Sequence, residues 1–209
     1  MQRLIVFAVL AVSCFAYRFT AEERQAIVDA HNWARDRIPI DFPEYAGATC
    51  LPHVEWDYYI EEVAQQYANT CPEDHSSSRN YEDGSHMGEN LAWQSWVSVI
   101  NYSTIAWYNE VQDYDPAEPG FSSATGHYTQ VVWNETRRIG CGVAYGCRSW
   151  MTTFVCNYWP AGNVLGYPAW IPAKDLGLEP VNVCLAAAST TSVSLVLIVS
   201  ALLAALLAL

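Results

Sequence analysis

Three stretches of the chain repeat apolar residues at the spacing of an amphipathic helix. The first follows TAEE at residues 20–23, which matches a capping box, and we expect this helix to end before Pro39. The second covers residues 56–69, with apolar positions at i, i+3, i+4 and i+7. The third covers residues 97–111, and prolines in the loop after it prevent its continuation.

Two later runs, residues 128–133 and 151–158, are rich in β-branched and aromatic residues, which favours strands. Gly140, Gly142 and Gly146 lie between them and are typical of turns. We therefore expect the two runs to pair as a hairpin. Helices that alternate with strands indicate a small mixed sheet with helices on both faces.

The two ends of the chain differ in composition from the single domain expected at residues 17–172. Residues 1–16 combine Arg3, an apolar run and a small-residue cleavage site, the pattern of a secretory signal peptide. After a linker at residues 173–188, residues 189–209 hold a short polar spacer and an uncharged apolar run. This pattern is typical of a GPI-anchor signal, and a tail-anchored membrane helix is the alternative. We expect an extracellular protein, secreted or attached to the cell surface.

The charge and the cysteines narrow the choice of partners. The chain has 22 acidic and 10 basic residues, a formal net charge of −12 at pH 7. Because a phosphate backbone is bound through clustered lysine and arginine, and Lys174 is the single lysine, we expect no nucleic-acid partner. Removal of Cys14 with the signal peptide leaves an even number of cysteines, which predicts disulfides in a secreted chain. Sequons at Asn101 and Asn134 predict N-glycosylation.

Two long motifs late in the chain carry a family resemblance. Residues 126–136 read GHYTQVVWNET, and residues 156–164 read CNYWPAGNV. They resemble the two signatures of the CAP superfamily, which comprises cysteine-rich secretory proteins, antigen 5 and pathogenesis-related 1 proteins. Thr153 departs from the second signature, which is usually apolar there. The resemblance covers about residues 22–168 and implies an α+β fold, a three-layer α-β-α sandwich with a small, mainly antiparallel sheet.

The resemblance also implies a metal site. His75, Glu89, Glu110 and His127 match the family's tetrad of two histidines and two glutamates. Imidazole nitrogen and carboxylate oxygen suit a divalent cation such as Zn²⁺, so we expect weak zinc binding and no essential cofactor. The glutamates would be further ligands or would orient the histidines. Taken singly, each such residue is more often a surface or capping group than a ligand, and only the fold can bring the four together.

A second family property is the binding of sterols and other lipids, which is attributed to an aromatic loop before the first signature. Tyr114, Pro119, Gly120 and Phe121 match that loop. The alternative is a loop held against the core by Tyr114 and Phe121. We expect a binding protein for a sterol, another lipid or a protein partner, with membrane attachment through its C-terminus.

The rival function is a metal-dependent hydrolase, a peptidase that uses the tetrad. Such an enzyme needs a nucleophile or a metal-bound water held beside a base. The hydroxyls in range, on Ser76, Ser77 and Thr129, lie in no nucleophile-elbow pattern. We therefore assign no catalytic residue and favour a binding function over an enzyme.

The order of the cysteines in the family implies how they pair. The expected disulfides join Cys71 to Cys147 and Cys141 to Cys156. Cys50 and Cys184 then remain as a third pair. Each such link typically stabilises a fold by about 2 to 4 kcal/mol.

Overall fold

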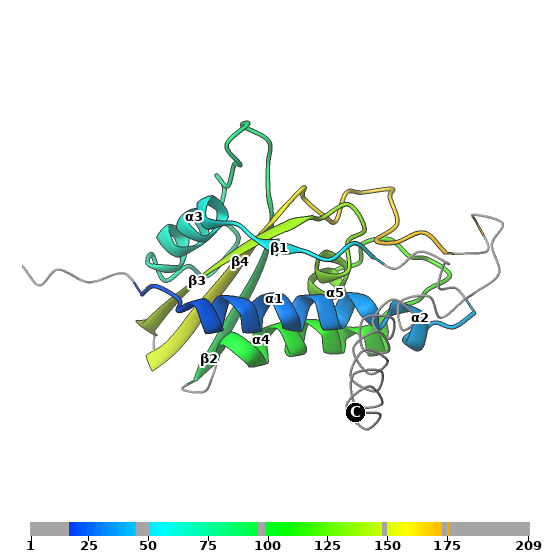
Figure 1. The fold of residues 1–209 in the computed structure, drawn as a ribbon, viewed down its shortest axis with the longest axis horizontal. Helices are drawn as coiled ribbons and strands as arrows, with labels where there is room; N and C mark the ends of the chain where they lie inside the picture. The colour runs from blue at the N-terminus through cyan, green and yellow to red at the C-terminus, as the bar shows by residue number, and fades with distance from the viewer. Residues whose placement is uncertain (1–16, 45–50, 96–98, 148–149, 173–174, 176–209) are drawn as a thin grey trace, which may run out of the picture.

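The computed structural model describes residues 17–44, 51–95, 99–147, 150–172 and 175. Figure 1 shows a central sheet with helices on either side. No helix within these ranges is long and apolar enough to cross a membrane. The elements in chain order are α1 (Ala21–Asp36), α2 (Ile38–Asp41), β1 (Glu55–Trp56), α3 (Tyr58–Ala68), β2 (Gly88–Ser95), α4 (Val99–Tyr108), the 3-10 helix η1 (Asn109–Asp113), α5 (Gly126–Val131), β3 (Arg138–Cys147) and β4 (Met151–Trp159).

The strands form one sheet in the order β1-β3-β4-β2. β1 runs parallel to β3, and the other two pairings are antiparallel. Ala64 and Ala68 of α3 pack on one face against Leu91 and Val155. Side chains of α1, α4 and α5 form the main core on the other face. This arrangement confirms the predicted α+β, α-β-α sandwich.

The first two predicted helices are confirmed, and the third is shorter than predicted. The capping box of α1 is formed, because the backbone N–H of Glu23 donates to Thr20 Oγ1 at 3.1 Å and that of Thr20 donates to Glu23 Oε2 at 2.8 Å. Asp57 caps α3 by accepting from two backbone N–H groups of the first turn. The third helix, α4, ends at Tyr108 and continues as η1.

The prediction of a strand at residues 128–133 is wrong, because residues 128–131 belong to helix α5 and residues 132–133 follow it outside any strand. Tyr128, Val131 and Val132 are all buried, at helical spacing. In a short segment that is buried all round, the apolar pattern does not distinguish a helix from a strand, and the β-branched residues favoured the wrong alternative. The hairpin of the structure joins β3 to β4 instead.

Gly140 and Gly142 lie inside strand β3 rather than in a turn, which corrects a second prediction. A Cβ atom on Gly140 would lie 2.2 Å from the backbone nitrogen of Glu61, and one on Gly142 would lie 2.3 Å from Gln65 Cα. Both neighbours are backbone atoms of α3, which therefore packs directly on the strand. Gly146, with φ of +70°, also lies inside β3, where the pairing with β4 is irregular between Ala144 and Cys147.

Arg35 of α1 fixes the position of α5. Its guanidinium is buried and donates to the carbonyl oxygens of Val131 at 3.0 Å and Trp133 at 2.9 Å, and also to those of Pro52 and Thr136. Burial, with the nearby charge of Arg137, lowers the pKa of Arg35 to about 9. These bonds satisfy carbonyl groups that a helix leaves free at its C-terminus.

Two of the expected disulfides are confirmed, Cys71 to Cys147 and Cys141 to Cys156. The expected third pair, Cys50 and Cys184, lies outside the described residues, as do the predicted signal peptide and the apolar C-terminal segment.

Candidate functional site

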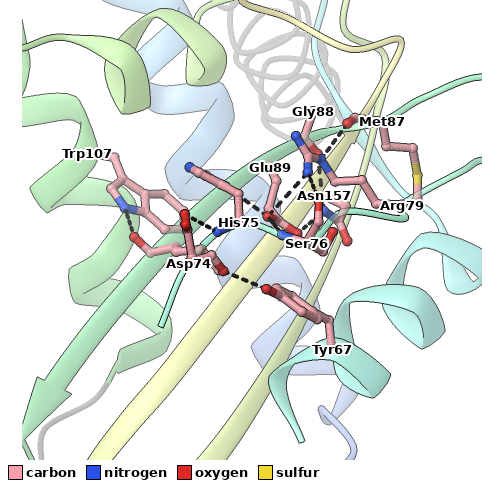
Figure 2. A network of polar contacts seen from close by, with 11 residues as sticks. Tyr67, Asp74, His75, Ser76, Arg79, Met87, Gly88, Glu89, Trp107 and Asn157 are labelled. Atoms are coloured by element: carbon pink, nitrogen blue, oxygen red, sulfur yellow. Dashed lines mark hydrogen bonds and ion pairs between the residues drawn. The ribbon is translucent and has the colours of Figure 1, made fainter. Parts of the chain in front are cut away.

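The first histidine–glutamate pair joins the segment after α3, which holds His75, to the edge strand β2, which holds Glu89 (Figure 2). His75 follows α3 in the chain, and its Nδ1 lies 2.8 Å from Oε1 of Glu89. The same oxygen accepts from the backbone N–H of Ser76 at 2.9 Å. The other oxygen accepts from Nδ2 of Asn157, directly opposite on β4, at 3.2 Å. Both oxygens of Glu89 are therefore satisfied.

Glu89 is a buried carboxylate whose surroundings favour the ionised form. Its side chain has 0% exposure, against 50% for His75. Burial alone would raise the pKa of Glu89, but the bonds from His75, Ser76 and Asn157 and the charge of Arg79 hold it below its ordinary value. Arg79 lies 3.7 Å from Glu89 and donates from Nε to the Met87 carbonyl.

The second pair joins η1 to the first turn of α5. Nδ1 of His127 lies 2.6 Å from Oε1 of Glu110. Oε2 of Glu110 accepts from the backbone N–H groups of His127 and Tyr128, both at 3.0 Å. These N–H groups belong to the first turn of a helix, where donors have no partner inside the helix. The pair is partly exposed, with side-chain exposures of 38% for His127 and 24% for Glu110.

Both pairs are attached to the same strand. Asn90, next to Glu89, donates from Nδ2 to the His127 carbonyl at 3.0 Å. Trp107 stacks on the His127 ring at 6.1 Å between centroids and donates to the Leu91 carbonyl at 3.2 Å. Within the described ranges, however, no three His, Cys, Asp or Glu side chains form a group that could hold a metal ion. The structure thus brings the four predicted residues together as two pairs.

The pairing decides which nitrogen of each histidine is available. A carboxylate can only accept a hydrogen bond, so Nδ1 carries the proton in both His75 and His127. In the neutral ring, Nε2 then keeps its lone pair. Nε2 is therefore the atom that each histidine could offer to a cation, while Glu89 and Glu110 hold the rings through Nδ1.

The predicted aromatic loop borders a pocket of about 510 Å³, which we call the loop pocket. Tyr114, Pro119, Gly120 and Phe121 all line it, and Tyr167 lines it from a later segment. Tyr114 is only 7% exposed, and its hydroxyl is buried without a hydrogen-bond partner among the described residues. Phe121 is 42% exposed and Tyr167 64%. The loop therefore has one side chain in the core and another open to solvent.

Comparison with known proteins places this architecture in a family. The model of the cysteine-rich secretory protein family, CAP, matches residues 28–158. The chain belongs to the CAP family.

Its relatives include proteins of insect venoms. Venom allergen 3 of Solenopsis invicta is 37% identical over 173 residues, which cover 73% of either chain. Venom allergen 5 of Microctonus hyperodae is 34% identical, and the match covers 71% of either chain. Among solved structures, NaASP2 with Zn²⁺ is 27% identical, has a TM-score of 0.57, and matches over 74% of this CAP protein and 90% of that chain. The CAP protein is extracellular, in agreement with its venom relatives and its disulfides.

Several residues around the histidine–glutamate pairs and the loop pocket were not predicted as functional. Asn157 lies inside the second signature and Asn90 follows Glu89 directly, so both had a signal in the sequence. Trp107 belongs to an aromatic stripe that is equally typical of a core, and it does lie in the core. Arg79 and Tyr167 have no signal that separates them from surface residues, because their neighbours in space come from other segments.

The two sequons stay predictions. Asn134 is half-buried and donates to Glu135, while the Thr136 hydroxyl is buried and donates to the Pro160 carbonyl at 3.0 Å. The side chain of Asn101 lies outside the described part of the structure.

Proposed function

We propose that this CAP domain is a binding protein that holds a sterol or a related lipid in the loop pocket. The observation that carries the proposal is the Tyr114 hydroxyl, which is buried without a partner among the described residues and belongs to a pocket-lining side chain. A buried hydroxyl without a partner costs about 1 to 3 kcal/mol, which a ligand hydroxyl can recover. Phe121 and Tyr167 supply apolar area beside it.

The size and charge of the loop pocket narrow the class of ligand. Its volume of about 510 Å³ falls within the range of small-molecule sites, roughly 300 to 1,000 Å³. Asp113, Asp115 and Glu118 also line it, and no described lysine or arginine does. An anionic headgroup is therefore disfavoured. A sterol, with one neutral hydroxyl and a rigid apolar body, matches these features better than a fatty acid.

Equilibrium binding of cholesterol to the purified full chain tests the proposal. Tyr114→Phe keeps the buried ring and removes only the hydroxyl, so it should fold normally and bind about ten-fold more weakly. Tyr102→Phe is the matched control, because Tyr102 is 64% exposed and lines no part of this pocket. Undiminished binding by Tyr114→Phe, or equal losses in both variants, would remove the basis of the proposal.

A second function, weak binding of a divalent cation such as Zn²⁺, is supported by the two oriented histidines. His75 and His127 would hold the ion through Nε2. A bound zinc ion would supply a positive charge at the open edge of β2. Since a histidine must be neutral to ligate, binding should weaken in acid as protons compete for the same nitrogens.

Zinc titration by calorimetry on variants distinguishes binding at the two histidines from binding at acidic residues elsewhere on the surface. The double variant His75→Ala, His127→Ala should lose binding and keep its fold, because the sheet and disulfides do not depend on the metal. His53→Ala is the matched control, since His53 also pairs with a carboxylate, Asp36, at 2.9 Å, but lies on the surface. Retained binding in the double variant would place the metal elsewhere.

The peptidase alternative has less support. Ser76 Oγ is buried without a partner among the described residues, and the Thr129 hydroxyl donates to Asn163 Oδ1 at 2.7 Å. Neither hydroxyl is paired with a histidine among the described residues, which leaves a metal-bound water as the better-supported nucleophile. A peptidase screen with and without chelator decides the matter: cleavage that chelator and His75→Ala both abolish would favour the enzyme.

We also propose that the domain is attached to the cell surface through residues 189–209, with a glycolipid added near residues 186–189. Phosphatidylinositol-specific phospholipase C should then release it from cells. Retention after treatment, with the C-terminal peptide still present, would favour the membrane-spanning alternative.

A further inference from the structure

A second pocket, which we call the strand-end pocket, lies on the sheet face that α3 covers. Its volume is about 260 Å³. It shares no lining residue with the loop pocket and includes neither histidine–glutamate pair. It is lined by Cys71, Pro72, Glu73, Trp93, Cys147, Met151 and Thr153.

The strand-end pocket exists because α3 is shorter than the strands beneath it. The helix covers the cross-strand pair Leu91 and Val155 and ends at Ala68. The next pair on the same face, Trp93 and Thr153, lies beyond the end of the helix, and 41% of Trp93 is exposed.

The turn after α3 forms one side of the strand-end pocket and is held firmly. Cys71 adopts a left-handed conformation with φ of +51°, and its disulfide ties it to Cys147 on β3. The indole N–H of Trp93 donates to the carbonyl of Pro72 at 2.8 Å. The Trp93 side chain is therefore attached to the turn, and the pocket is formed without a ligand.

Thr153 and Glu73 are the polar side chains that line this pocket, and Thr153, which is 1% exposed, is the one whose buried hydroxyl lacks a partner among the described residues. The Trp93 side chain cannot be that partner, because its one donor, the indole N–H, donates to the Pro72 carbonyl. Thr153 also replaces the apolar residue expected at this position of the signature. A buried hydroxyl is unfavourable unless something pairs with it, and a ligand in the pocket would do so.

We propose that the strand-end pocket binds a small neutral aromatic alcohol, a ligand of the phenol class. A single aromatic ring suits a volume below the usual range for drug-sized ligands. The indole of Trp93, the thioether of Met151 and the disulfide are the soft, polarisable surfaces that aromatic rings prefer. The ligand hydroxyl pairs with that of Thr153.

A four-way comparison tests the proposal on the full chain with its disulfides intact. Affinities of 4-methylphenol and 1,4-dimethylbenzene are measured by ligand-observed NMR titration on the native protein and on Thr153→Val. The two probes differ by a hydroxyl and a methyl group, as do the two proteins. The variant keeps the shape of the side chain and removes an unpaired hydroxyl, so it should fold. The ratio of the two affinities should fall about five-fold in the variant.

Two further variants complete the design. Thr104→Val is the matched control, because Thr104 is also fully buried and its hydroxyl has no partner in the described part of the chain, but it does not line the strand-end pocket. It should leave the ratio unchanged, whereas Trp93→Ala should abolish binding of both probes. The proposal is overturned if neither probe binds the native protein, if Thr153→Val leaves the ratio unchanged, or if Thr104→Val shifts it equally.

Discussion

The histidine–glutamate pairs and the loop pocket differ in whether their buried polar groups have hydrogen-bond partners. At Glu89 both carboxylate oxygens accept hydrogen bonds, and the side chain is fully buried. At Tyr114 the hydroxyl is also buried, yet no described residue pairs with it. A satisfied buried network holds a structure rigid, whereas an unpaired buried group destabilises it. The hydrogen bonds of Glu89 therefore stabilise the fold without any ligand. A ligand that pairs with the Tyr114 hydroxyl would stabilise the loop pocket.

The largest expected effect is on the free energy of unfolding, when the hydrogen-bonded carboxylate of Glu89 is removed. Glu89→Ala leaves the buried donors of Ser76 and Asn157 without this acceptor and removes the partner of the half-exposed His75, and should lower the free energy of unfolding by about 4 kcal/mol. Tyr114→Phe removes a hydroxyl that no described residue pairs with, and should leave that free energy unchanged or raise it slightly. Chemical denaturation of the three proteins measures both effects.

Glu82→Ala serves as the control for Glu89→Ala, because Glu82 is exposed and should change stability by less than about 0.5 kcal/mol. A loss for Glu89→Ala no larger than this, or a larger loss for Tyr114→Phe, would reverse the comparison.

The next effect is the loss of stability in acid, and it comes from a buried histidine outside the two histidine–glutamate pairs. His31 of α1 is fully buried between the Ile27 carbonyl, 2.8 Å from Nδ1, and the Tyr158 hydroxyl, 3.0 Å from Nε2. Burial lowers its pKa from 6.5 to about 4. Between these values the unfolded chain binds a proton that the folded chain does not, so stability is full above pH 6.5 and falls toward pH 4. The expected loss is about 3 kcal/mol.

Denaturation midpoints measured across this range check the assignment to His31. His31→Gln should be less stable at neutral pH but should lose much less on acidification. The lowered pKa of Glu89 acts in a different window, because its contribution is present above the ordinary carboxyl value of 4.5 and disappears only at lower pH. An equal slope between pH 6.5 and 4 in both proteins would show that another group is responsible.

The orienting role of the two carboxylates predicts a smaller effect, on zinc affinity. Glu89→Gln and Glu110→Gln should each weaken binding about ten-fold, because an amide fixes the Nδ1 proton less firmly than a carboxylate. Glu118→Gln, in the acidic rim of the loop pocket, should have no effect on zinc. If Glu118→Gln weakens zinc binding as much as the other two, the ion lies at the pocket instead.

The smallest effect is expected at the rim of the loop pocket. Phe121→Ala should reduce sterol affinity about five-fold, through the loss of apolar contact area, and should change stability little because the side chain is 42% exposed. Ile40→Ala, at 43% exposure and outside the pocket, is the matched control. Equal sterol affinities for these two variants would show that Phe121 does not contact the sterol.

Local patterns in the sequence predicted α1 and α3 correctly, because each has a capping residue and one apolar face. They failed for α5, whose short segment is buried all round, and for Gly140 and Gly142, which allow α3 to approach the sheet rather than forming a turn. In both cases the deciding contacts come from segments far away in the chain, including Arg35 of α1.

The candidate site was predictable only in part for the same reason. The family motifs identified His75, Glu89, Glu110 and His127, but not that each glutamate holds the Nδ1 of one histidine. That pairing depends on β2, η1 and α5 meeting at one edge of the sheet. The unpaired hydroxyl of Tyr114 was equally invisible, because burial is a property of the fold.

The most direct test of the central claim is a map of where a sterol touches the protein. A photoreactive cholesterol analogue is bound to the full chain, activated by light, and its attachment points are identified by mass spectrometry. We expect attachment within residues 113–122 and at Tyr167, lost when unlabelled cholesterol competes. Attachment confined to residues outside the loop pocket, or no attachment that cholesterol displaces, would contradict the assignment of this pocket as the lipid site.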